Sequence, residues 1–205
     1  MEHRKLERED NFMVIEGGKA HSPEGQGEIP VDGDYTVRDI EALPEGERAE
    51  LIDGKMYMMA TPTLTHQELL MWMSVRIWSY IEGHGGLCKV IPAPFAVYIK
   101  DDDHNYVEPD VSVICDPNKL DEKGCHGAPD WVIEIVSPSS QVMDYIRKCS
   151  LYEAAGVREY WIVDPKKRSI MVYRFEQGAS GEYSFSERVE AGIYEDLFLD
   201  FDEVA

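Results

Sequence analysis

The stretch PDWVIEIVSPSSQVMDYIRKCSLYEAAG, Pro129 to Gly156, determines the fold we expect for this chain. It begins as an apolar strand, in which successive side chains point to opposite faces of a sheet. The alternation assigns three residues to each face: Trp131, Ile133 and Ile135 to one, and Val132, Glu134 and Val136 to the other. An ionised carboxylate within such a strand needs a partner or a metal ion. Glu134 therefore indicates a functional site.

A Ser-Pro turn leads from this strand into a helix that Ser139 or Ser140 caps and Gly156 ends. The spacing of apolar residues in this helix predicts a buried stripe of Val142, Tyr145, Ile146, Cys149 and Tyr152. On a wheel of 3.6 residues per turn, Gln141, Lys148 and Tyr152 share one edge of the stripe, and Arg147 points outward. Lys148 is the amine that we expect to reach toward the sheet.

Length and charge limit the possible functions. The chain has 205 residues, with 40 acidic and 20 basic residues and a net charge of −20. This charge opposes non-specific attraction to phosphates, which depends on Lys and Arg. No apolar run approaches the roughly 18 residues of a membrane span, and the start MEHRKLERED is charged and unlike a signal peptide. We expect a cytoplasmic protein without a membrane partner.

The four cysteines, Cys88, Cys115, Cys125 and Cys149, form no CxxC pair and are too few for a disulfide scaffold. Reduced thiols are the simplest interpretation, in keeping with a cytoplasmic setting. Zinc binding by Cys115, Cys125 and His126 is disfavoured, since their spacing fits no standard pattern.

The chain divides into an N-terminal extension, residues 1–33, and a single domain, residues 34–205. We expect part of the extension to be mobile, with only Phe12 to Ile15 able to pack or add a strand. The expected helices are 37–43, capped by Thr36, and one from Thr63 or Thr65 to about 82. The expected strands are 49–52 and 55–60, joined by an Asp53-Gly54 turn, then 87–91, 95–100, 111–115, 131–136, 159–163, 169–175 and 183–189. The C-terminal segment 193–205 is expected to pack loosely. This pattern predicts an α+β fold around one mixed or mostly antiparallel sheet.

Four ionisable residues occur within or beside these elements: Glu50, Asp110, Glu134 and Lys148. Carboxylates from adjacent strands suit a hard divalent cation, which prefers oxygen ligands. A nearby ammonium can stabilise developing negative charge. Such a set suits the hydrolysis of a phosphodiester bond.

The residues that carry a resemblance occur in a fixed order: AELIDGK around Glu50, His66 in the first turn of the long helix, EPDVSVI, DWVIEIVSPSS and DYIRKCSLYEAAGVREYWIVDP. From about Tyr35 to Phe175 the chain resembles the Uma-type restriction endonuclease family of the PD-(D/E)XK nuclease superfamily. The resemblance implies a restriction-endonuclease-like core, a central mixed sheet flanked by helices. It also implies Mg²⁺ or Mn²⁺ as cofactor and DNA as substrate.

The resemblance also implies roles for individual residues. Asp110 matches the acid of the PD element, Glu134 matches the first acid of (D/E)XK, and Glu50 matches the upstream acid, so these three are the expected metal ligands. Val136 occupies the usual lysine position of that element. Lys148 matches the lysine that this family carries on the following helix instead. His66, Gln141 and Tyr152 are expected to support the site from around it.

Each residue also has a structural explanation. Glu134 could be a buried acid paired with Lys148 or Arg158, Asp110 a turn acid and Glu50 an exposed strand residue. His66 could have no role, and Lys148 could extend its amine to solvent. At the level of function, two alternatives remain: an inactive nuclease-fold interaction protein, and a metal-dependent hydrolase of a small phosphorylated substrate. A homodimer through Phe12 to Ile15 or the C-terminus is also open.

Overall fold

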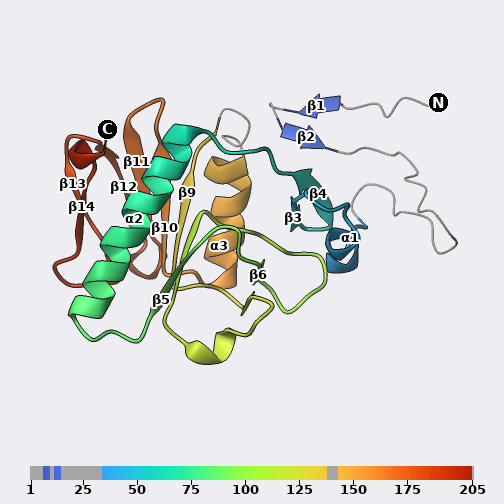
Figure 1. The fold of residues 1–205 in the computed structure, drawn as a ribbon, viewed down its shortest axis with the longest axis horizontal. Coiled ribbons are helices and arrows are strands. Elements are labelled where there is room, and N and C mark those ends of the chain that lie inside the picture. The colour runs from blue at the N-terminus through green and yellow to red at the C-terminus, as the bar shows by residue number, and fades with distance from the viewer. Residues whose placement is uncertain (1–6, 10–11, 15–33, 138–142, 205) are drawn as a thin grey trace, which may run out of the picture.

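The structure is a computed structural model that describes residues 7–9, 12–14, 34–137 and 143–204. Its centre is a six-stranded sheet in the order β12-β11-β10-β9-β7-β5 (Figure 1). The strands are β5 (Lys89–Pro92), β7 (Val111–Ile114), β9 (Trp131–Ile135), β10 (Glu159–Asp164), β11 (Ser169–Arg174) and β12 (Ala179–Ser184). β9 and β10 are parallel, and all the other neighbours are antiparallel. The predicted α+β class with a central mixed sheet is confirmed.

The two faces of β9 bury different sets of side chains, as the alternation of its residues predicts. Trp131, Ile133 and Ile135 belong to one apolar core and Val132 and Val136 to another. The first core is covered by α2 (Leu64–Gly83), whose buried residues follow helical spacing: Leu69, Leu70, Met73, Ile77 and Ile81. Thr63 caps this helix, as predicted, through a hydrogen bond from the backbone N–H of His66.

The second core is covered by a helix that follows β9 in two segments. A π-helical segment, η2 (Met143–Lys148), leads into α3 (Cys149–Ala155), which ends at Gly156 with φ of 88°. Figure 1 shows α2 and α3 beside the sheet strands, so helices flank the sheet as expected. Ile146 is 62% exposed, so its expected place in the buried stripe is wrong. A π-helix bonds residue i to i+5, which rotates side chains away from a 3.6-residue wheel.

A small sheet in the order β1-β2-β4-β3 lies beyond this core. The hairpin of β3 (Ala49–Ile52) and β4 (Lys55–Met58) turns at Asp53-Gly54, as predicted. The strands β1 (Glu7–Glu9) and β2 (Phe12–Val14) extend it, so residues 12–14 of the segment expected to pack or add a strand do form one, and Ile15 lies outside the described residues. The helix α1 (Val37–Glu41) begins after Thr36, which forms a capping box with Asp39. Residues 1–6, 10–11 and 15–33 lie outside the described residues, so the expected mobility stays a prediction.

The remaining short elements complete the described part of the chain. They are the parallel pair β6 (Val97–Tyr98) and β8 (Cys125–His126), the antiparallel pair β13 (Arg188–Glu190) and β14 (Phe198–Asp200), and three 3₁₀ turns, η1 (Pro117–Lys119), η3 (Phe175–Gln177) and η4 (Phe201–Glu203). The expected strand 95–100 is thus shorter in the structure. The expected strand 183–189 is wrong, because a turn at Phe185 to Glu187 divides it. The Glu187 carboxylate accepts a hydrogen bond from the Ser184 N–H, and this bond holds the turn.

The C-terminal segment is part of the core, which corrects the expectation of loose packing. Leu197, Leu199 and Phe201 are at most 5% exposed and pack in the same core as α2. The ring of Phe201 lies 5.1 Å from that of Trp72. In β14, the buried Leu199 lies between the more exposed Phe198 and Asp200, as expected for a strand with one face on the core and the other toward solvent. The side chains of Leu197, Leu199 and Phe201 are therefore not available for a dimer contact.

Cys88 and Cys115 form a disulfide, so the expectation of reduced thiols is wrong for this pair. β5 and β7 pair Lys89 with Ile114, and one step further this register brings the two cysteines together. The bridge also excludes Cys115 as a zinc ligand. Cys125 and Cys149 are free thiols.

Candidate active site

Lys148 and Glu134 form the centre of the candidate site. The Lys148 Nζ lies 2.9 Å from Glu134 Oε1 and 2.8 Å from Glu50 Oε2, so one ammonium joins acids from β9 and β3. All three residues are at most 4% exposed. The predicted approach of the helix lysine to the strand acid is therefore present. The exposed-strand explanation of Glu50 and the solvent-directed explanation of Lys148 are both excluded.

The small hairpin delivers Glu50 to this position. Leu51 in β3 exchanges backbone hydrogen bonds with Tyr106, which ties the hairpin to the segment before β7. The backbone N–H of Glu108 donates to Glu50 Oε1 at 3.0 Å. Glu108 is itself held by the Arg48 guanidinium. These contacts fix the Glu50 carboxylate toward Glu134 and Lys148.

Asp144 is a fourth buried member that we did not predict. Its Oδ1 lies 3.7 Å from the Lys148 Nζ, and the residue is 2% exposed. The signal was in the sequence, because residues four apart on a helix are neighbours. The Tyr160 hydroxyl donates to the Asp144 backbone carbonyl at 2.9 Å, which anchors this segment to β10.

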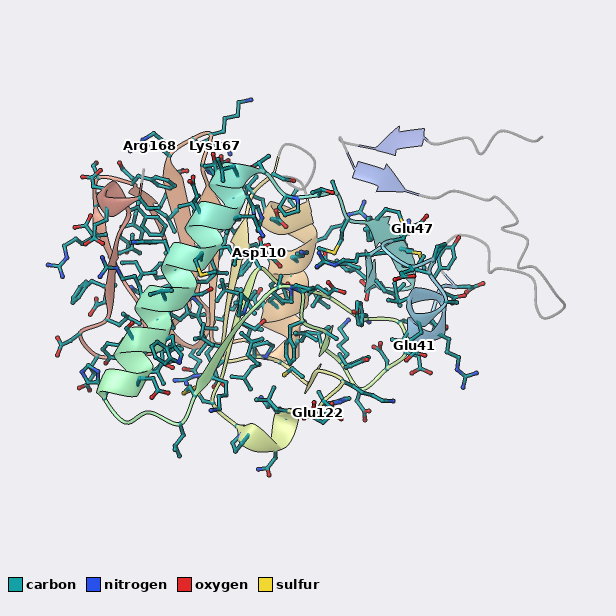
Figure 2. The ribbon with its side chains drawn as sticks, viewed as in Figure 1. Glu41, Glu47, Asp110, Glu122, Lys167 and Arg168 are labelled. Carbon is teal, nitrogen blue, oxygen red and sulfur yellow. A yellow bond between two sulfur atoms is a disulfide. The ribbon has the colours of Figure 1, made fainter. Side chains whose placement is uncertain are left out.

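Asp110 lies beside this cluster and is held by other partners. The register that pairs Val111 with Ile133 brings Asp110 opposite Glu134. Its Oδ2 accepts a hydrogen bond from the Ile135 backbone N–H at 2.7 Å and lies 3.2 Å from the His66 Nε2. His66 therefore has a contact within the site, from the first turn of α2. Figure 2 shows Asp110 near the middle of the molecule.

Burial and charge set the protonation of the site. Burial raises the pKa of Glu134 well above its usual range; the Lys148 charge opposes this shift, and the charges of Asp110, Glu50 and Asp144 add to it. Burial lowers the pKa of Lys148, but the neighbouring acids outweigh burial and the net shift is upward. Lys148 is thus an ammonium, and the excess of acids around it favours a bound proton or a further cation.

The acids of the site also raise the pKa values of two neighbouring residues, Tyr152 and His66. The Tyr152 hydroxyl donates to Glu134 Oε1 at 2.7 Å, and burial followed by the charges of Glu134 and Glu50 raises the pKa of Tyr152. Burial lowers the pKa of His66, but the hydrogen bond and ion pair with Asp110, together with the hydrogen bond to Gln67 and the charge of Asp144, outweigh burial and raise the pKa above 6.5. Tyr152 thus lies where the sequence predicts a supporting group. Gln141, the other expected supporting residue, lies outside the described residues.

The site contains the type of ligand atom that a hard divalent cation prefers, because Glu50, Asp110, Glu134 and Asp144 all offer carboxylate oxygens. The buried negative charge exceeds that of Lys148, and a cation could balance it. Within residues 34–137 and 143–204, however, no three such side chains are grouped as ligands around one point. Lys148 lies between Glu50 and Glu134, and the Asp110 carboxylate contacts the Ile135 N–H and the His66 ring instead.

Comparisons with known proteins identify the family of the chain and support its fold. A family model described as "Uma2: Putative restriction endonuclease" matches residues 37–202. The uncharacterized Synechocystis protein slr1290 is 27% identical over 148 residues, which are 70% of this chain and 76% of that protein. A crystal structure from Anabaena variabilis, titled as a "putative nuclease belonging to DUF820", aligns with a TM-score of 0.65 at 22% identity. The alignment covers 83% of this chain and 97% of the chain in that structure. No helix of the described residues is long and apolar enough to cross a membrane.

Proposed function

Because the chain belongs to the Uma2 restriction endonuclease family, we propose that it is a metal-dependent endonuclease that hydrolyses phosphodiester bonds in DNA. The observation that carries the proposal is the position of the Lys148 Nζ, within 2.9 Å of carboxylates from two separate strands. A buried network that concentrates acids around one amine is costly to assemble for stability alone. Perturbed buried groups of this kind are typical of catalytic sites.

Each residue has a proposed role. Asp110, Glu134 and Glu50 would hold Mg²⁺ or Mn²⁺, and Asp144 would add to the negative charge that attracts it. The bound ion would neutralise charge that develops on the phosphate oxygens. Lys148 would hold the attacking water and stabilise the phosphate through its ammonium. His66 would keep the Asp110 carboxylate in place, and Tyr152 would do the same for Glu134.

Cleavage of supercoiled plasmid DNA in Mg²⁺ or Mn²⁺ tests the proposal. We expect cleavage by the wild type and a loss of about 100-fold or more in Glu134→Gln and Lys148→Met, since each removes a charge used in the transition state. Glu153→Gln is the matched control, because Glu153 is an exposed acid on α3. Equal cleavage by wild type and both site variants would remove the assignment.

A catalytically inactive interaction protein is the second candidate. Lys148 already bridges Glu50 and Glu134, and a buried ion-pair network of this kind can persist without a metal. Titration with Mn²⁺, followed by calorimetry, separates the two functions. Saturable binding that Glu134→Gln weakens supports the nuclease, and no binding at millimolar Mn²⁺ supports the interaction protein. A hydrolase of small phosphorylated substrates would instead show competition between nucleotides and DNA.

A further inference from the structure

The turn that joins β10 to β11 carries Lys166, Lys167 and Arg168, the only run of three consecutive Lys or Arg residues in a chain whose net charge is −20. All three side chains are exposed. Figure 2 shows Lys167 and Arg168 at the upper edge of the molecule in this view and Glu122 at the lower edge. This concentration of positive charge suggests an anionic partner.

Strand register relates this turn to the candidate site. β9 and β10 are parallel, and Ile162 pairs with Glu134, so the turn begins three residues beyond the level of the catalytic acid. At about 3.3 Å per residue, that is roughly 10 Å along the strand. The Lys167 Nζ also lies 4.6 Å from the ring centre of Tyr145, three residues before Lys148 in η2.

The turn is held rigidly by its own contacts. The buried Asp164 carboxylate accepts hydrogen bonds from the backbone N–H groups of Lys166 and Lys167, at 3.0 and 2.9 Å. The Lys167 Nζ lies 3.3 Å from the same carboxylate, and the Arg168 guanidinium lies over the Phe185 ring. Cations that are held in place in this way lose less conformational entropy when they bind a ligand.

The backbone of Arg168 is an independent observation. Its φ is +54°, and the other non-glycine residues with positive φ in the described part of the chain are both aspartates. Aspartate tolerates this left-handed region because its short side chain bonds locally, whereas an arginine side chain is too long for such a local bond. Strain that persists at an exposed turn points to a use for the side chain.

We propose that Lys166, Lys167 and Arg168 bind the phosphate backbone of the DNA and position it at the edge of the acid–lysine site. This inference rests on the proposed nuclease function and names the surface that would overcome the net charge of the chain. The three cations would replace counterions along the strand, so they would add affinity without selecting a sequence.

Fluorescence anisotropy of a labelled DNA duplex, with Ca²⁺ as the divalent ion, tests the surface. In the variant with Lys166→Gln, Lys167→Gln and Arg168→Gln, we expect affinity at low salt to fall about tenfold or more. The affinity should also depend less steeply on salt: the slope of log affinity against log salt concentration should be smaller in magnitude by about 2 to 3. Lys123→Gln, an exposed lysine beside Glu122, should bind like the wild type.

Arg168 allows a sharper test. Arg168→Gly and Arg168→Ala both remove the guanidinium, so they should lose the same affinity for DNA. Only glycine relieves the positive φ, so the Gly variant should melt about 2–4 °C above the Ala variant. Affinity that follows melting temperature would mean that the turn has only a structural role.

The outcomes separate the two proposals. If the wild type binds DNA through the turn but cleaves none in Mg²⁺ or Mn²⁺, the proposed nuclease function is wrong and the proposed DNA-binding surface still holds. A wild type that binds no duplex, or a triple variant with the affinity and salt slope of the wild type, would overturn the surface.

Discussion

At Glu134, two influences act on one proton in opposite directions. Burial and the surrounding acids favour the neutral carboxyl, and the Lys148 ammonium favours the carboxylate. The net effect is a raised pKa, so the folded chain holds the proton more tightly than the unfolded chain does. The same residue is thus a source of instability at neutral pH and, in the proposed function, a metal ligand.

The sign of this shift predicts how stability depends on pH. As the pH rises from about 4.5, the usual pKa of the group, toward its folded value, the free energy of unfolding should fall. Lys148 stays charged throughout this window, because its pKa lies above 10.5. Urea unfolding between pH 5 and 8 should therefore show a smaller decline in Glu134→Gln than in the wild type. Identical pH dependence in the two proteins would contradict the buried, perturbed carboxyl.

The His66–Asp110 pair makes a second residue-level prediction. Asp110 opposes the effect of burial, so the pKa of His66 should be above 6.5 in the wild type and lower in Asp110→Asn than in the wild type. The pair stabilises the fold fully below pH 6.5, and this contribution is lost as the pH rises through the folded pKa. An NMR titration, with the signal assigned through its absence in His66→Gln, measures both values. An unchanged pKa in Asp110→Asn would exclude the ion pair.

At the scale of elements, two segments bring the site together. The π-helical turn of η2 places both Asp144 and Lys148 on the sheet side and leaves Ile146 exposed. The small hairpin carries Glu50 across to the same point. The acids thus come from elements far apart in the chain, and only packing brings them into contact.

The C-terminal element offers a test of packing. Phe201 is fully buried between Trp72 and Phe185, so Phe201→Ala should lower the free energy of unfolding by about 3–5 kcal/mol. Phe198, in β14, is 38% exposed and serves as the matched control. Phe198→Ala should cost less than about 1 kcal/mol. Urea unfolding compares them, and equal small losses would mean that the C-terminus packs loosely after all.

At the scale of the whole molecule, a covalent bond and the net charge both act on stability. The Cys88–Cys115 disulfide closes a loop with a sequence separation of 27, which joins the connection after α2 to the end of β7. A cross-link restricts the unfolded chain more than the folded one. The charge of −20 acts in the other direction, through repulsion within the compact state.

Removal of the disulfide gives the prediction at this scale. Cys88→Ser with Cys115→Ser should lower the free energy of unfolding by about 2–4 kcal/mol, and a reducing agent should destabilise the wild type by a similar amount. Reducing agent should leave the double variant unchanged. Thermal unfolding with and without reductant measures this, and equal melting temperatures would show that the bridge does not form in solution.

Local patterns were enough to predict much of the fold. The alternation of β9, the hairpin at Asp53-Gly54 and the capped helix after Thr63 all follow from the chemistry of neighbouring residues. The resemblance to a known family then singled out Glu50, Asp110, Glu134 and Lys148. These fold predictions were possible because strand alternation, turn chemistry and helix caps each depend on residues close together in the chain.

Residue patterns along the chain therefore suffice to predict the class of the fold, the strand that carries Glu134 and the lysine that approaches it. Four contacts could be seen only in the folded chain: Asp144 beside Lys148, Asp110 beside His66, Phe201 in the core and Cys88 bonded to Cys115. The physical reason is the same in each case. Strand and helix patterns depend on neighbours in the chain, whereas these contacts depend on register and packing between segments far apart in it.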